Sequence, residues 1–305
     1  MKKPAMLRSI LAGALGIGLV IGLFLLTGVS FAALSDLIAR LKWSAFGGIV
    51  ACSFLYVILG GMKWHIIAGV PGPRPFFYLH HTAQAMLLGQ FLPVPVAIAA
   101  NRAAVMKLKQ NATIKKGLLN AIYDMGFDFL VAALLIPASL LQLLYGFDFT
   151  YWLALGVVMV FAASISLMFA PKLLPARWLT KVGLTEQRKQ GLLSPRIIGL
   201  MMFLSTTRFA ITIVRLMLGA VALGITVPLA AVAYATPPST MSALLALTPA
   251  NLGIAEWSWA YLLTLWGVPA AVGALYGISF RILIFAAQVI VSGVCHGLYE
   301  SGKRR

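Results

Sequence analysis

The stretch IIGLMMFLSTTRFAITIVRLMLGAVALG, residues 197–224, decides the fold class of this chain. It is longer than the roughly 20 apolar residues that a helix needs to cross about 30 Å of hydrocarbon. Its only charged side chains are Arg208 and Arg215. The stretch therefore predicts a membrane-spanning helix that carries two arginines at membrane depth.

The composition extends this interpretation to the whole chain. Of the 305 residues, 61% are hydrophobic and only 10% are charged, and the mean hydropathy is +0.95. A soluble domain carries about 25% charged residues. The sequence thus predicts an all-α integral membrane protein in which residues 1–305 form a single polytopic domain.

Six stretches have the length and apolar character of a spanning helix. They are residues 9–34, 43–62, 117–144, 151–170, 197–224 and 268–295. The first has an alternative interpretation, because its apolar core follows Lys2, Lys3 and Arg8 and ends in Ser30-Phe31-Ala32, which suits a cleaved signal peptide. The core is longer than that of most signal peptides, which favours an uncleaved helix.

Two further apolar segments are interrupted by proline. Residues 76–100 contain Pro93 and Pro95, and residues 227–256 contain Pro228, Pro237, Pro238 and Pro249. Proline removes a backbone donor, and broken backbone at membrane depth is tolerated only where it packs in protein or lines a wet cavity. Both segments are predicted to be re-entrant or broken helices; the alternative is an ordinary span with a kink.

The distribution of basic residues supports the re-entrant interpretation. The chain has 24 Lys and Arg against 7 Asp and Glu, a formal net charge of +17. With a cytoplasmic N-terminus and six spans, all basic residues fall on the cytoplasmic side except Arg40, Lys42 and three arginines within spans. Lys63 and Arg102 are among the residues placed there. The excess charge is therefore interpreted as an orientation signal for a cytoplasmic (inner) membrane protein with both termini inside, and not as a nucleic-acid surface.

Six charged residues remain at membrane depth, and their signs cancel. They are Asp124, Asp128, Glu256, Arg208, Arg215 and Arg281. Each costs about 2.5 to 3.5 kcal/mol at a helix centre, so such residues pair or face water and commonly mark function. Helical spacing places the two aspartates on one face and Arg208 and Arg215 on another, which predicts two facing stripes of opposite sign. The alternative is that they form purely structural ion pairs.

No catalytic, metal or cofactor site is predicted. Cys52 and Cys295 lie in apolar stretches, His80 and His81 point to different helix faces, and His65 and His296 stand alone.

The two broken segments have similar layouts. Pro93 is followed by Arg102 and then Asp128, and Pro249 is followed by Glu256 and then Arg281, with reversed signs. Units of residues 76–144 and 227–298 are therefore predicted to form an inverted repeat, which would place a transport site near the midplane.

Two motifs resemble those of a known family. TPANLGIAEW, residues 248–257, is similar to the Pro-Gly-Gly-Leu-Gly-Val-x-Glu segment of the flippase-like transmembrane region of lysylphosphatidylglycerol synthases and their stand-alone relatives. GQFLPVPVAIAANRA, residues 89–103, is similar to the family's Asn-Gln-x-Leu-Pro-x-x-x-Gly-Gly-Asp-x-x-Arg. The matching residues are Gln90, Leu92, Pro93, Arg102, Pro249, Leu252, Gly253, Glu256, Gly267, Ala274 and Arg281.

The departures from the family fall in the loops. Ala97-Ile98-Ala99 stand where the family has Gly-Gly-Asp, and Ala250-Asn251 replace its paired glycines. The first loop has thus lost its acidic residue, and both have lost flexible backbone. The expected loop-forming residues are Pro93, Pro95, Pro249, Asn251 and Gly253.

The resemblance implies a membrane lipid or lipid-linked glycan translocase. The expected substrate is a phospholipid or a polyprenyl-linked lipid, whose head group would pass through a groove lined by Arg102, Asp124, Asp128, Arg208, Arg215, Glu256 and Arg281. Family synthases carry a soluble aminoacyl-transferase domain, for which the longest predicted loop, residues 171–196, is too short. Two alternatives stay open: a non-catalytic partner of a separate glycosyltransferase or lipid synthase, and an intramembrane lipid-modifying transferase.

Overall fold

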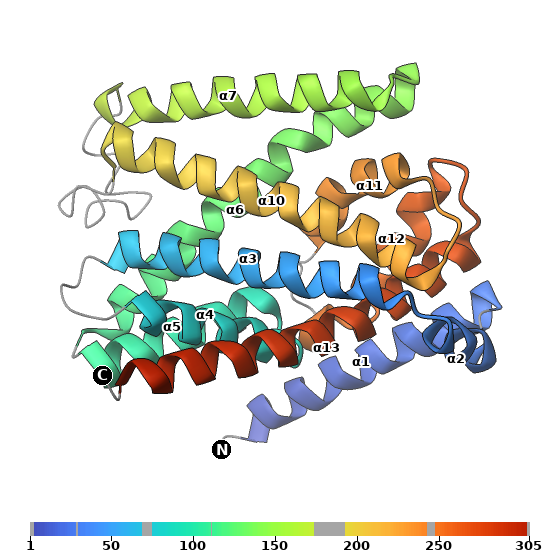
Figure 1. The fold of residues 1–305 in the computed structure, drawn as a ribbon, viewed down its shortest axis with the longest axis horizontal. Helices are drawn as coiled ribbons and strands as arrows, with labels where there is room; N and C mark the ends of the chain where they lie inside the picture. Colours follow the sequence, from blue (N-terminus) through green and yellow to red (C-terminus); the bar gives the residue numbers. More distant parts are fainter. Residues whose placement is uncertain are drawn as a thin grey trace.

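The structure is a computed structural model that describes residues 3–28, 30–68, 75–110, 112–173, 193–242 and 248–303. Every regular element in these ranges is a helix, which confirms the predicted all-α class (Figure 1). The helices are α1 (Lys3–Thr27), α2 (Phe31–Ala39), α3 (Trp43–Ala68), α4 (Pro75–Leu88), α5 (Val94–Gln110), α6 (Ile114–Tyr145), α7 (Phe149–Leu173), α10 (Pro195–Leu223), α11 (Leu229–Ser242), η2 (Pro249–Asn251), α12 (Ile254–Thr264) and α13 (Ala270–Lys303).

Five described helices are long and apolar enough to cross a membrane: α3, α6, α7, α10 and α13. A sixth span results if the bent pair α1 and α2 is counted as one. The chain is therefore a multi-pass membrane protein. Several predicted spans are shorter than the helices, and the difference matters most at α3, which continues from residue 62 to Ala68.

The first predicted span, residues 9–34, is wrong at its end. Helix α1 ends at Thr27, and α2 begins at Phe31 after a bend of 92°. Gly28 adopts a positive φ of 68°, the usual way to end a helix. The Ser30 side chain then caps α2 by accepting a hydrogen bond of 3.1 Å from the Ala33 amide. These signals override the continuous apolar character of the stretch.

The first proline-interrupted segment forms a helical hairpin of α4 and α5. In Figure 1, α4 begins and α5 ends at the same end of the molecule, beside the start of α6. Pro93 lies in the turn between the two helices, and Pro95 lies in the first turn of α5, where no helical donor is lost. The segment therefore returns to the side that it left.

The second segment forms a hairpin of α11 and α12 that starts from the opposite end of the molecule (Figure 1). Pro237 and Pro238 lie inside α11 without ending it, and neither is among the loop-forming residues that the sequence predicts. Neighbouring helices can hold a proline-containing helix together, and α11 packs on α6 and α12. Residues 243–247 of this segment lie outside the described residues.

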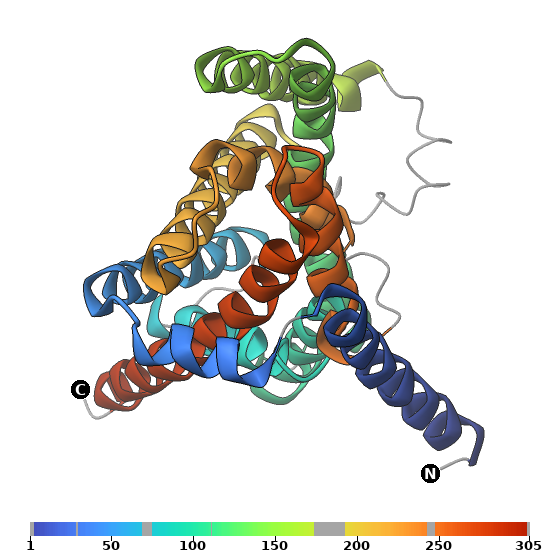
Figure 2. The same cartoon turned by 90° about the vertical axis from the view of Figure 1, so that its right-hand side faces the viewer.

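The helices of the first half of the chain make contacts equivalent to those of the second half. Helix α4 packs on α3, α5 and α13, and α11 packs on α10, α12 and α6, while α3 and α10 pack on each other (Figures 1 and 2). A glycine in the first turn of each long helix allows a close approach. A Cβ on Gly117 would lie 2.6 Å from Ala103 Cα, and a Cβ on Gly273 would lie 3.0 Å from Ala260 Cα.

Basic residues gather at one end of the bundle, the end that carries the C-terminus in Figure 1. Lys107 and Lys109 end α5 there, and Lys115 and Lys116 begin α6. Arg40 and Lys42 lie between α2 and α3 at the other end. Arg74 and most of the predicted cytoplasmic loop, residues 171–196, lie outside the described residues.

Candidate functional site

The two aspartates of α6 form the centre of a buried ion network. Asp124 accepts from the Arg102 guanidinium of α5, and its Oδ1 lies 2.5 Å from the Lys63 ammonium of α3. Asp128 lies 2.6 Å from the same ammonium and accepts from Arg208 of α10. Four helices are thus joined by five charged side chains.

Burial makes these pairs obligatory. The side chains of Lys63, Arg102, Asp124 and Arg208 are at most 4% exposed, whereas Asp128 is 27% exposed. A charge removed from water is tolerated only when it is paired and its remaining polar atoms are hydrogen-bonded. The cations therefore also donate to backbone oxygens: Lys63 to Asp124 O at 3.1 Å, and Arg102 to Asn120 O at 3.2 Å.

The sequence predicts Lys63 and Arg102 among the basic residues of the cytoplasmic side, and the structure buries both side chains inside the helix bundle. The predicted span stopped at residue 62 because Lys63 was taken as its boundary. The residues that follow contained the missing signal, since Trp64, Ile66, Ile67 and Ala68 continue the apolar character of α3. Lys63 is therefore the network residue that sequence reasoning missed.

Arg208 and Arg215 lie two turns apart on α10 and share one aromatic partner. Their guanidinium carbons lie 4.1 Å and 5.0 Å from the centre of the Tyr56 ring of α3. Arg208 pairs with Asp128, but Arg215 has no carboxylate partner among the described residues, and its Nε has no hydrogen-bond acceptor. Of the two arginines predicted to face the aspartates of α6, only Arg208 therefore pairs with one of them.

The six charges predicted at membrane depth cancel, but the ion network adds two cations to them. Lys63 and Arg102 join Arg208, Arg215 and Arg281, so five cations face the three carboxylates Asp124, Asp128 and Glu256 in the described core. Two positive charges are therefore left over. One of them is located at Arg215, which lacks an acid.

The second hairpin has its own ion pair, between Glu256 of α12 and Arg281 of α13. The Arg281 guanidinium also donates to Ala250 O at 3.0 Å and to Asn251 O at 3.3 Å. The other Glu256 oxygen accepts from the Gly253 amide at 2.8 Å and so caps α12. Arg102 and Glu256 thus occupy comparable places, each joining a hairpin to the long helix that follows.

The space inside the first network is small. Gly60, Trp64, Thr82 and Met86 are among the residues that enclose it with Arg102, Asp124, Asp128 and Arg208. The cavity holds about 10 Å³, which is room for about one water molecule. The network is closed in this conformation.

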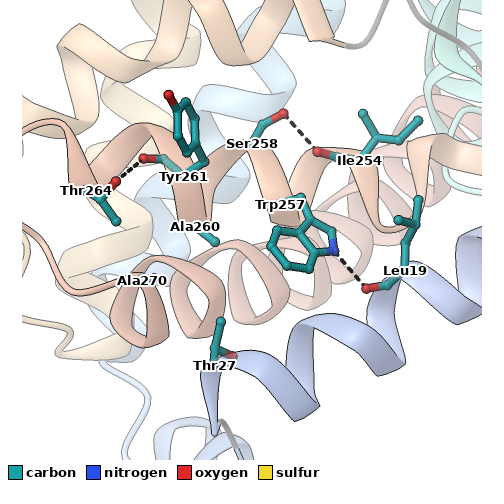
Figure 3. A pocket seen from close by; sticks show the side chains of 9 residues that line it. All are labelled: Leu19, Thr27, Ile254, Trp257, Ser258, Ala260, Tyr261, Thr264 and Ala270. Carbon is teal, nitrogen blue, oxygen red and sulfur yellow. Dashed lines mark hydrogen bonds between the residues drawn. The ribbon is translucent and has the colours of Figure 1, made fainter.

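A larger pocket lies between α1, α12 and α13. Its volume is about 530 Å³, and Trp257, Tyr261 and Thr264 of α12 form much of its wall (Figure 3). The Trp257 indole donates a hydrogen bond of 2.9 Å to Leu19 O, which attaches α1 to α12. The pocket is mostly apolar and lies beside the second hairpin.

The four histidines, of which His65 and His296 stand alone in the sequence, meet in one aromatic cluster of the structure. His80 stacks on Tyr299 with 4.6 Å between ring centres, and His81 and His296 lie 4.8 Å and 5.2 Å from His80. His65 contacts Tyr78 of the same aromatic cluster at 5.1 Å. The cluster joins α4 to α3 and α13. Among the described residues, no group of three or more His, Cys, Asp or Glu side chains is arranged so that it could hold a metal ion.

Comparison with known proteins identifies the family. The sequence model of the lysylphosphatidylglycerol synthase TM region matches residues 10–292, which is most of the chain. Neither the comparison with curated proteins nor the comparison with solved structures gives a match. The match covers both hairpins and all of the charged residues described above, and it supports a membrane protein with a lipid-related role. The chain belongs to the lysylphosphatidylglycerol synthase transmembrane-region family.

Proposed function

We propose that this protein is a flippase-like translocase that moves the polar head group of a membrane phospholipid or polyprenyl-linked lipid between leaflets. The observation that carries the proposal is the surplus of cations in the helix core, above all Arg215, a half-buried residue whose Nε is buried without an acceptor and which has no acid among the described residues. An unpaired buried charge is costly, and an anionic ligand would offset that cost. A phosphate-bearing head group has the required charge.

Arg208 and Arg215 suit successive positions of such a head group. Seven residues separate them, which corresponds to about 10 Å along α10. A guanidinium binds phosphate through two parallel hydrogen bonds, so each arginine offers a complete binding geometry. The Tyr56 ring lies against both and keeps them on one face.

Translocation requires the closed network to open. Its cavity admits about one water molecule, so a head group has to displace a side chain. Asp128 is the most exposed member, and Arg208 is the cation that it would release. In this proposal the phosphate replaces the Asp128 carboxylate at Arg208, while Lys63 holds the freed carboxylate.

The hairpins support a path through the protein. They start from opposite ends of the molecule, and each is followed by a long helix that bears its ion-pair partner. Inverted repeats of this kind place transport sites near the midplane. We propose that residues 76–144 and 227–298 are such units, and that the end rich in lysine and arginine faces the cytoplasm.

The test is leaflet exchange in liposomes that contain the purified protein. Labelled phospholipids and polyprenyl lipids are assayed with wild type, Arg215→Gln, Glu256→Gln, Arg281→Ala and the control Arg196→Gln, an exposed arginine at the start of the same helix as Arg215. Loss of a charge-assisted hydrogen bond predicts exchange slower by about tenfold or more for Arg215→Gln. Arg196→Gln should exchange at the wild-type rate. Exchange at the protein-free rate for every lipid would rule out the translocase.

A further inference from the structure

The turn at the tip of the second hairpin is held by two side chains. Arg281 donates to the carbonyl oxygens of Ala250 and Asn251, and Glu256 accepts from the Gly253 amide. The two side chains also pair with each other. Within the turn, Leu252 N donates to Pro249 O at 2.9 Å and Thr248 Oγ1 donates to Leu252 O at 2.8 Å.

The backbone of this turn is strained. Ala250 and Asn251 both have a φ of 53°, and they are the only residues other than glycine with positive φ in the described chain. Side chains disfavour this left-handed region, alanine more than asparagine. The two residues stand where the resembling motif has its paired glycines. Arg281 binds the carbonyls of these two strained residues, so the guanidinium holds the turn in a conformation that its own sequence disfavours.

The two partners differ in access. The Arg281 side chain is 25% exposed, whereas Glu256 is 2% exposed. Glu256 also lies at the third position of α12, where the positive end of the helix dipole favours a carboxylate. If Arg281 moves to another anion, Glu256 therefore keeps the Gly253 amide and its place in the helix cap. The guanidinium is therefore the more accessible partner of the pair.

We propose that Arg281 is a ligand-responsive latch, and that an anionic lipid head group which takes this guanidinium releases the strained turn at Ala250 and Asn251. The ligand class is the phosphate of a lipid whose head group has a net negative charge. Such a phosphate can accept two parallel hydrogen bonds from the guanidinium, which now donates to Glu256 and to two backbone carbonyls, and no ammonium of the same head group competes for it. The inference rests on the proposed function in assigning the anion to a lipid. It adds the step by which binding moves the hairpin.

Release of the turn would be transmitted to α1. Gly253 lies against Leu19 of α1, and a Cβ on Gly16 of α1 would lie 3.3 Å from Leu252 O. Trp257, one turn into α12, donates to Leu19 O (Figure 3). Helix α1 is thus seated on the latched turn and on α12. A loosened turn removes part of the surface on which α1 packs and opens the pocket between α1 and α12.

Hydrogen exchange of the whole protein in lipid nanodiscs tests the latch. Exchange of the Asn251 and Leu252 amides, which bond within the turn, is compared in phosphatidylcholine alone, in phosphatidylcholine with anionic phosphatidylglycerol, and in phosphatidylcholine with inorganic phosphate in the buffer. The latch predicts exchange about tenfold faster with phosphatidylglycerol, since local opening sets the rate. Inorganic phosphate should have no such effect. An equal rise with inorganic phosphate would overturn the assignment to a lipid.

Variants separate the latch from a general change in stability. Arg281→Gln should exchange fast in every lipid and lose the response to phosphatidylglycerol. If Arg281→Gln does not fold, Arg281→Lys takes its place in the test. Lysine keeps the positive charge but cannot hydrogen-bond Glu256 and two backbone carbonyls at once. The exposed Arg196→Gln should respond as wild type does. Equal exchange of wild type in both lipids, or a response retained by both Arg281 variants, would overturn the latch.

The hydrogen-exchange result and the leaflet-exchange result can fail independently of each other. A turn that responds in a protein that moves no lipid in liposomes would overturn the translocase and leave the latch. A turn that does not respond in a protein that does move lipid would overturn the latch alone.

Discussion

The Lys63 ammonium lies 2.5 Å from Asp124 and 2.6 Å from Asp128, so one lysine of α3 is the shared counter-ion of both acids of α6. Its side chain is fully buried. Arg102 and Arg208 occupy the remaining oxygens of the same two acids. Lys63 thus links two ion pairs. Arg102 and Asp124 join the first hairpin to α6, and Asp128 and Arg208 join α6 to α10.

Replacing Lys63 should destabilise the protein strongly. In Lys63→Gln the network loses the cation that two buried carboxylates share, and removing one partner of a buried pair costs about 3 to 5 kcal/mol. Thermal unfolding in detergent measures the effect. Lys109→Gln, an exposed lysine in the last turn of α5, should shift the midpoint little. Equal midpoints for both variants would contradict a structural role for Lys63.

Gly117 should be intolerant of a side chain. A Cβ at this position would lie 2.6 Å from Ala103 Cα and 2.8 Å from Arg102 O, both backbone atoms of α5. Gly117→Ala should therefore lower the free energy of unfolding by about 1 to 3 kcal/mol. Gly126→Ala in the same helix is the control, since no heavy atom lies within 4 Å of its added Cβ. That variant should be neutral or stabilising, and equal losses for the two would refute the packing argument.

Ala250→Gly should stabilise the protein. Glycine adopts the observed φ of 53° without the Cβ clash, which costs alanine about 1 to 2 kcal/mol. Part of that gain is cancelled by the greater freedom of glycine in the unfolded chain, so the expected net rise is about 1 kcal/mol. Chemical or thermal unfolding checks the sign. Ala255→Gly, within α12, should have the opposite sign because glycine is a poor helix former.

Labelling from the two sides of the membrane tests the orientation. Lys109 and Asp148 are exposed, and they lie at opposite ends of the bundle, at the end of α5 and just before α7. In a chain whose Cys52 and Cys295 are replaced by Ser, Asp148→Cys should react with an impermeant maleimide in intact cells. Lys109→Cys should react only after permeabilisation. The reverse pattern would invert the proposed orientation, and reaction of both from one side would contradict the fold.

The sequence by itself was enough for the fold class, five of the spans, the hairpin character of both interrupted segments and the presence of Glu256 and Arg281 in the second of them and the helix that follows. These features follow from local properties: apolar length, proline position and residue spacing. It was not enough for the bend between α1 and α2, because a single glycine and a serine cap ended an apolar run that would otherwise continue.

Only the tertiary structure decided which charges meet. Whether a lysine at the end of an apolar run bounds a helix or lies buried beyond it depends on the acids that other helices bring near, and these are about 60 residues away in the chain for Lys63. The same holds for Arg215, which packing against α3 places beside Tyr56 and which has no acid partner among the described residues. Local sequence places a charge at membrane depth, while long-range packing determines whether that charge is neutralised in place or left for a ligand.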